Sequence, residues 1–213
     1  MAKRGPVAFR AHTDHLNAFT RDRVGWLDIY PARTRLSSSE QDIDSPLLVD
    51  VGGGIGRDAL MFRRQFPDRA QAVIVQDIPD VIADASKNLP SDSGLTLQAV
   101  DFFDLQPVQG ARLYLLHYVL HDWADKDCLT ILNNIKVAMR KDFSSLLIVE
   151  SMIASEKADM FSTALKTTIM SMVGSRECSE NDWRRLIAGT GMRITSIYTS
   201  VGNAECVVEV GSG

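Results

Sequence analysis

The strongest constraint on the fold is a series of short apolar segments that recurs after Pro46. Five of them have the pattern of β-strands: LLVDVG (47–52), QAVIVQD (71–77), LTLQAVD (95–101), ARLYLLHYVL (111–120) and SSLLIVES (144–151). Nearly continuous apolar runs of this length are typical of strands that are covered on both faces. Helical patterns separate several of them, notably Arg57–Phe66 and Lys126–Arg140. Because strands that alternate with helices form βαβ units, the sequence predicts an α/β fold with a mostly parallel sheet.

The last part of the chain departs from this alternation. The segments MRITSIYTS and AECVVEV are separated by a short turn at Gly202-Asn203, which predicts an antiparallel hairpin. Further helices are predicted at about Ala158–Val173 and at Glu180–Ala188. The whole pattern favours a Rossmann-like, doubly wound, mostly parallel sheet with a C-terminal antiparallel hairpin.

Residues 1–45 differ in pattern from the rest. The stretch His12–Tyr30 predicts one or two helices, and the polar stretch Ser37–Ser45 predicts a linker. We therefore expect residues 1–45 to form a helical arm with a linker, and residues 46–213 to form one domain.

Composition limits the classes of partner. The chain has 213 residues, of which 45% are apolar and 23% charged, and its formal net charge is −4. This charge gives no general attraction to nucleic-acid phosphates or to anionic membranes. Cys128, Cys178 and Cys206 cannot all pair and match no zinc spacing, so we expect a reducing compartment and no metal. We find no signal-peptide pattern and no apolar run of membrane-spanning length, which favours a cytoplasmic location.

The segment DVGGGIGRD joins the first predicted strand to the first predicted helix. Gly52, Gly54 and Gly56 permit a tight turn and a close approach of a ligand to the backbone. A dinucleotide fingerprint that starts at Gly52 would need glycine where Arg57 stands. The spacing is D-x-G-x-G-x-G instead, and Asp50 beside it suits a ligand with an ammonium group and hydroxyls. A plain tight connection between strand and helix is the alternative interpretation.

Two further acids follow at the ends of predicted strands. Asp77 ends the second strand, where it could accept hydrogen bonds from ribose hydroxyls or cap the next helix. Asp101 ends the third strand, and Phe102 and Phe103 beside it could bracket an adenine. Ligands of open α/β sheets bind at the carboxyl ends of strands, where Asp50 also lies. This ordered set resembles that of class I S-adenosylmethionine-dependent methyltransferases, which implies S-adenosyl-L-methionine as the cofactor.

The resemblance extends from Pro46 to the C-terminus. The segments LLVDVGGGIG, VQDIPDVI, VDFFD, YVLHDWADKDC, LLIVES and SRECSENDWRRLIAGTGM occur in this order. They resemble small-molecule O-methyltransferases of the plant caffeate type and their fungal relatives, for which LHDW is the most telling element. The resemblance implies methylation of a phenolic or enolic small molecule of secondary metabolism. Two other functions stay open: a non-catalytic or partner-dependent subunit, and a non-methylating catalyst on the same scaffold.

The resemblance also implies the catalytic residues. His121 is the general base, because an imidazole can accept the proton of the acceptor hydroxyl near neutral pH. Glu150 and Glu177 flank it, although Glu150 taken alone would be a solvated acid at a strand end. His117 stands where most relatives carry lysine or arginine, which implies a cofactor contact. Asp122 fits equally a site residue and a cap of the following helix.

The substrate residues are implied in the same way. Ile169, Met170 and Met172 match the family's substrate-contact helix, with plain helix packing as the alternative. Trp123 fits a core residue better than a wall of the cofactor pocket. Two departures weaken inference about the substrate: the family's E-R-T segment loses its arginine here, and Lys166 replaces an acid that commonly begins the substrate helix.

The front of the chain departs most from the family. Relatives usually carry an N-terminal helical domain of about 100 residues or more, which supplies a dimer interface. Only about 45 residues precede the glycine strand here, so we expect a homodimer or a partner chain. Residues 7–30 contain Phe9, Phe19, Trp26 and Tyr30, and an isolated helix of this length is marginal in water. We expect them to cover the pocket near His121 or to dock on a second chain, with a poorly ordered arm as the alternative.

Overall fold

The computed structural model describes residues 25–36, 44–69, 71–151, 179–200 and 205–213. Four predicted segments fall wholly or partly outside these ranges. They are the helices within His12–Tyr30, of which only the last part is described, the linker Ser37–Ser45, the helix at Ala158–Val173, and the turn at Gly202-Asn203.

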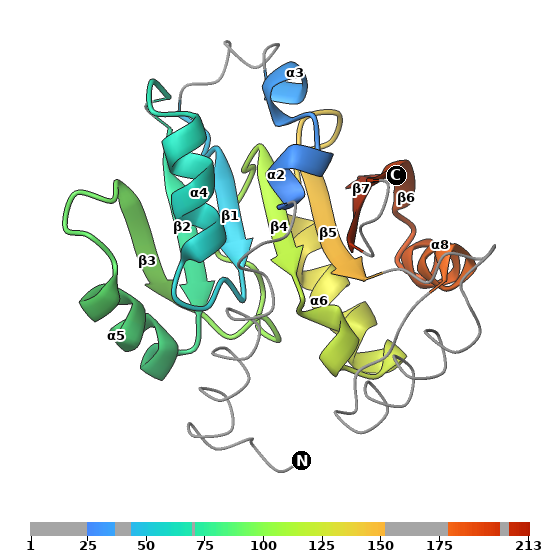
Figure 1. Ribbon diagram of the computed structural model, residues 1–213. Coiled ribbons are helices and arrows are strands. Elements are labelled where there is room, and N and C mark those ends of the chain that lie inside the picture. The colour runs from blue at the N-terminus through green and yellow to red at the C-terminus, as the bar shows by residue number, and fades with distance from the viewer. Residues whose placement is uncertain (1–24, 37–43, 70, 152–178, 201–204) are drawn as a thin grey trace, which may run out of the picture.

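A seven-stranded sheet runs through the middle of the molecule (Figure 1). The strands are β1 (Leu48–Val51), β2 (Val73–Asp77), β3 (Leu95–Ala99), β4 (Leu113–His117), β5 (Ser145–Ser151), β6 (Arg193–Thr199) and β7 (Glu205–Gly211). Their order is β3-β2-β1-β4-β5-β7-β6, with β1 to β5 parallel and β7 antiparallel to both β5 and β6. This arrangement confirms the predicted fold class.

One predicted strand is too long. The fourth apolar run continues to Leu120 in the sequence, but β4 ends at His117. Tyr118 has a φ of 51°, a left-handed conformation that an extended strand cannot contain. The chain then forms a short 3₁₀ helix, η1 (Leu120–Asp122), which lies beyond the carboxyl end of β4.

Helices cover both faces of the sheet (Figure 1). One face carries α2 (Trp26–Ile29), α3 (Ala32–Leu36), α4 (Arg57–Gln65) and α5 (Pro79–Asn88), and the other carries α6 (Asp125–Ala138) and α8 (Glu180–Ala188). The ends of α4, α6 and α8 agree with the predictions to within two residues, the usual uncertainty of a helix end. No helix within the described ranges is long and apolar enough to cross a membrane.

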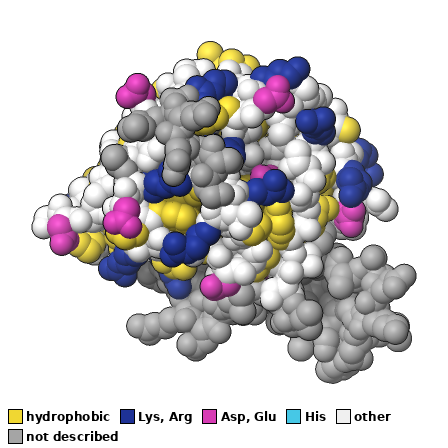
Figure 2. Space-filling view, turned by 90° about the horizontal axis from the view of Figure 1, so that it is seen from above, with side chains coloured by type: hydrophobic (Ala, Val, Ile, Leu, Met, Phe, Trp, Pro, Cys, Tyr) yellow, Lys and Arg dark blue, Asp and Glu magenta, His cyan; other side chains and the backbone are white. Residues whose placement is uncertain are grey.

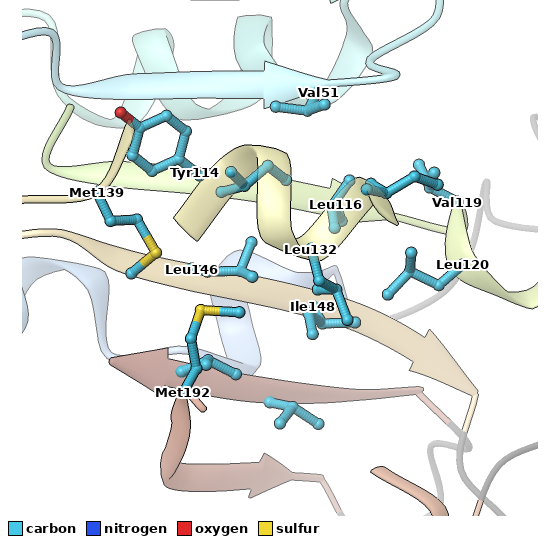
Figure 3. Close-up of a cluster of buried hydrophobic side chains, with 14 of the residues drawn as sticks. Val51, Tyr114, Leu116, Val119, Leu120, Leu132, Met139, Leu146, Ile148 and Met192 are labelled. Atoms are coloured by element: carbon cyan, nitrogen blue, oxygen red, sulfur yellow. The ribbon is translucent and has the colours of Figure 1, made fainter. Parts of the chain in front are cut away.

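Alternation along the strands divides the core into two layers. In β4, Leu113 and Leu115 face α2 to α4, whereas Tyr114 and Leu116 face α6 and α8, and all four are fully buried. Figure 3 shows the second layer, in which Leu132 of α6 belongs to the same cluster as Tyr114 and Leu116 of β4. Each aliphatic side chain buried in this way contributes about 1.5–3 kcal/mol relative to an exposed one.

The described part of the predicted N-terminal arm packs into the first layer. Trp26 is fully buried and its ring stacks on Phe62 of α4, with 6.0 Å between centroids. Tyr30 is 2% exposed and donates its hydroxyl to the buried Glu209 of β7 at 3.2 Å. Burial and the nearby Glu209 carboxylate raise the pKa of Tyr30. The segment 25–36 is therefore part of the core of this domain.

Basic side chains lie at the end of the sheet where the parallel strands β1 to β5 begin, opposite the carboxyl ends of these strands. Arg63 and Arg64 lie in the last turn of α4, and Lys136 lies in the last turn of α6. Cations are favourable at these places because helix C-termini carry partial negative charge. Figure 2 views the molecule from this edge and shows Lys and Arg side chains spread across it. Those predicted site residues that the structure describes lie at the other edge.

Candidate functional site

The glycine loop between β1 and α4 needs its glycines for conformational reasons. Gly52, Gly54 and Gly56 have φ values of 71°, 58° and 80°. The amide of Gly52 donates to the carbonyl oxygen of Gln76 at 2.8 Å, which ties the loop to the end of β2. A Cβ added at Gly54 would meet no described atom within 4 Å. The loop is thus both a tight connection and a place where a ligand could reach the backbone.

Asp50 lies beneath this loop. Its side chain is 1% exposed, and a Cβ added at Gly53 would come within 2.6 Å of its carboxyl group. Burial and the neighbouring Asp58 raise the pKa of Asp50 well above its usual range, while His117 acts in the opposite direction. Oδ2 of Asp50 has no hydrogen-bond partner among the described residues. It is a buried polar atom aimed at the loop.

Asp77 joins the glycine loop to the end of β2. Its Oδ2 accepts from the amide of Gly54 at 2.9 Å, and its Oδ1 accepts from the amide of Ile78 at 2.8 Å. Burial raises the pKa of Asp77, and these two hydrogen bonds oppose the shift. The N-cap of α5 is Ile78, so Asp77 is not the helix cap that the sequence allowed. Each carboxylate oxygen keeps further acceptor capacity, as ribose hydroxyls require.

An aromatic cluster follows β3. The ring of Phe103 contacts Trp123 edge-on at 4.8 Å between centroids, and Phe102 contacts it at 5.8 Å. Oδ1 of the exposed Asp101 accepts from the amide of Phe103 at 3.0 Å. A Cβ added at Gly52 would lie 3.5 Å from the ring of Phe102. The structure therefore brings this loop beside the glycine loop, and Trp123 packs behind it at the border of the core.

His121 and Glu150 form a pair at the carboxyl ends of β4 and β5. Nδ1 of His121 lies 3.1 Å from Oε2 of Glu150, and the amide of Leu120 donates to Oε1 at 3.0 Å. Glu150 is 3% exposed, so it is not the solvated acid that its position alone suggested. The carboxylate accepts Nδ1–H, which leaves the lone pair of the imidazole on Nε2. Asp122 lies with its Oδ1 3.7 Å from that nitrogen, and the N-cap of α6 is Ala124.

His117 is held by two carboxylates that the sequence did not reveal. Its Nδ1 lies 3.0 Å from Oδ2 of Asp58, and its Nε2 lies 2.8 Å from Oε1 of Glu205. Burial disfavours the charge on His117, but the two acids outweigh it and hold its pKa well above the usual range. Oδ1 of Asp58 accepts from the indole of Trp26 at 3.1 Å. Asp58 could have been noticed because it follows the glycine loop directly, whereas Glu205 carries no sequence signal.

Tyr118 separates the two histidines and was also missed. Its ring stacks on His117 at 4.8 Å and meets His121 edge-on at 5.7 Å. Its hydroxyl lies 3.3 Å from Oγ of Ser151. Its left-handed φ of 51° is the kind of backbone strain that concentrates at functional sites, but this angle comes from the structure and no sequence pattern indicated Tyr118.

Four predicted site residues cannot be placed. Glu177, Ile169, Met170 and Met172 lie outside the described residues, so their roles stay predictions. The structure brings the remaining predicted residues to one edge of the sheet.

Comparison with known proteins agrees with this geometry. The family model of the O-methyltransferase domain matches residues 36–193. O-methyltransferase mfmE of Annulohypoxylon moriforme is 36% identical over 200 residues, which are 93% of this chain and 48% of that protein. The structure of LepI in complex with SAM is similar with a TM-score of 0.81 and 29% identity, over 98% of this chain and 52% of LepI.

A second solved structure is similar to the same degree. OxaC in complex with sinefungin and meleagrin has a TM-score of 0.82 and 29% identity, over 95% of this chain and 51% of OxaC. The chain spans about half the length of the curated relatives it matches. Because the family model covers most of the chain and the fold is that of class I methyltransferases, the chain belongs to the O-methyltransferase domain family.

Proposed function

We propose that this chain is the catalytic part of an S-adenosylmethionine-dependent O-methyltransferase that methylates a phenolic or enolic hydroxyl of a small molecule. The observation that carries the proposal is the contact between Nδ1 of His121 and Oε2 of Glu150 at 3.1 Å. This contact lies at the same sheet edge as the glycine loop and Asp77.

The pair has the properties of an oriented general base. Glu150 is held in place by the amide of Leu120 and fixes the tautomer of His121. Nε2 can then take the proton of an acceptor hydroxyl, and the buried carboxylate stabilises the imidazolium that forms. A positioned base of this kind contributes about 10²–10⁴-fold to the rate.

The described residues fit the proposed cofactor. The space above Gly54 admits a ligand to the backbone, and Asp77 offers carboxylate oxygens to ribose hydroxyls. Phe102 lies beside Gly52 of the glycine loop, which supports a role for Phe102 and Asp101 in bracketing the adenine, and the buried Oδ2 of Asp50 lies beneath the same loop. When bound, S-adenosylmethionine supplies an activated methyl group on a sulfonium centre. LepI was solved in complex with SAM, which supports the same choice of cofactor here.

The proposal also covers the acceptor contacts and the assembly. Glu177 as the second flanking carboxylate, and Ile169, Met170 and Met172 as acceptor contacts, rest on the family pattern alone. A small organic acceptor is supported by OxaC, which was solved with meleagrin bound. A homodimer or a partner chain is proposed because the family resemblance implies an upstream domain that supplies a dimer interface.

The test combines binding with chemistry. Calorimetric titration with S-adenosylmethionine should show binding, and radiolabelled methyl transfer should be measured against a panel of phenols, with and without a full-length relative. His121→Ala should lower transfer by about 10²–10⁴-fold and leave cofactor affinity nearly unchanged. If the variant loses binding and thermal stability together, His121 is structural and the base assignment is wrong. An acceptor that the chain converts without taking up label would support the non-methylating alternative.

A further inference from the structure

The loop that follows β3 is held from α6 by a residue with no part in the chemistry above. Asn134 lies partly buried in the middle of α6. Its Nδ2 donates to the carbonyl oxygen of Phe102 at 3.2 Å and to that of Phe103 at 2.8 Å. Because both partners are oxygens that can only accept, the orientation of the amide is unambiguous.

The other end of this loop has a separate anchor. Nε2 of Gln76 donates to Oε1 of Gln106 at 2.9 Å, and Nε2 of Gln106 donates back to Oε1 of Gln76 at 2.8 Å. Both side chains are buried, at 1% and 4% exposure. This reciprocal pair fixes the part of the loop that runs toward β4. The part that carries Asp101 and Phe102 is held by Asn134 and by ring contacts with Trp123.

The two bonds of Asn134 reach consecutive carbonyl groups, so they set the direction of the peptide between them. That peptide also contains the amide of Phe103, which donates to Oδ1 of Asp101 at 3.0 Å. A rotation of the peptide would therefore turn Asp101 and the ring of Phe102 at the same time. The ring of Phe102 lies beside Gly52, so it would contact a ligand that is bound on the glycine loop.

We propose that Asn134 is a positioning residue that holds Asp101 and Phe102 in the arrangement that recognises the adenine of the cofactor. The inference rests on the cofactor proposed above. The hydrogen bonds of Asn134 go to the backbone of this loop and not to the pair of His121 and Glu150, so its loss should act on recognition of the nucleoside.

The test uses a matched pair of variants on one helix. Asn134→Asp keeps the shape of the side chain but replaces the two donors by a carboxylate that faces two carbonyl oxygens. Asn133→Asp makes the same change in charge at the adjacent exposed position. Affinities for S-adenosylhomocysteine and for S-inosylhomocysteine, which carries hypoxanthine in place of adenine, are measured by calorimetry. Asn134→Ala repeats the test without added charge, and unfolding midpoints are recorded for every variant.

Asn134→Asp should weaken S-adenosylhomocysteine binding by roughly tenfold. It should also reduce the preference for adenine over hypoxanthine, whereas Asn133→Asp should stay within about twofold of the wild type for both ligands. Gln106→Ala should lower the unfolding midpoint and keep the preference, because it loosens the other end of the loop.

Equal weakening of both ligands by Asn134→Asp, or the same loss of preference in Gln106→Ala, would overturn the proposal. Tight binding by the wild type with no change in the Asn134 variants would overturn it while the proposed function stands. The readout needs no methyl transfer, so an inactive chain can still give the expected result. If the wild type does not bind S-adenosylhomocysteine, both this proposal and the proposed function are wrong.

Discussion

Replacement of His117 by glutamine should destabilise the fold and change how stability depends on pH. Nδ1 of His117 lies 3.0 Å from Asp58 and Nε2 lies 2.8 Å from Glu205. Two carboxylates on both ring nitrogens require both nitrogens to donate, so the ring is an imidazolium. His117→Gln removes this cation and leaves the two acids close together with at most one amide donor group between them.

The expected loss follows from burial. The side chains of His117, Asp58 and Glu205 are 14%, 24% and 6% exposed. Removal of one partner from a fully buried ion pair costs about 3–5 kcal/mol. Because solvent screens Asp58 in part, we expect a loss of about 2–3 kcal/mol, or roughly 1 M in the urea midpoint. His117→Gln combined with Asp58→Asn should recover part of the loss, since the repulsion between the acids is gone.

The sign of the pH effect follows from the raised pKa of His117. In the unfolded chain a histidine loses its proton near pH 6.5, whereas the folded protein keeps it to a higher pH. The stability that His117 supplies is therefore complete below about pH 6.5 and declines by about 1.4 kcal/mol per pH unit as the pH rises toward the folded pKa. Urea unfolding of wild type and His117→Gln between pH 6 and 9 measures the difference. A difference that does not change with pH would refute the imidazolium.

Two further predictions concern the cofactor edge. Asp77→Ala should weaken cofactor binding by about 1–3 kcal/mol if the acid accepts hydrogen bonds from a buried ribose, and unchanged affinity in calorimetry would remove Asp77 from the site. Gly53→Ala should destabilise the fold by about 1–3 kcal/mol, because its Cβ would meet the Asp50 carboxyl at 2.6 Å. Gly54→Ala should lower the free energy of unfolding by at most about 1–2 kcal/mol in the same urea assay. The added Cβ would meet open space, so only the positive φ is unfavourable. A larger loss for Gly54→Ala than for Gly53→Ala would contradict this account of the loop.

Local pattern was enough to predict the sheet and the outline of the site. Apolar runs that alternate with helices specify a parallel sheet, because each strand must be covered on both faces. Parallel strands end at one edge, so Asp50, Asp77 and Asp101 could be placed together from their positions at strand ends. The pairing of His121 with Glu150 was expected from the family pattern, and the structure brings the two side chains to 3.1 Å.

Contacts between distant parts of the chain could not be predicted in this way. Glu205 lies 88 residues from His117, and Glu209 lies 179 residues from Tyr30. Both acids lie on β7, whose antiparallel register beside β5 decides which of its side chains face the interior. The alternation of side chains along a strand indicates its two faces, but it does not show which neighbouring element each face will contact.

The sequence by itself therefore determined the order of strands and helices, the glycine loop and the acids at the strand ends, because these depend on spacing along the chain. Only the tertiary structure decided that residues 25–36 belong to the core, that His117 is held between two acids, and that Asn134 fixes the loop after β3. Such contacts arise when the packed sheet brings together side chains whose separation in sequence carries no signal.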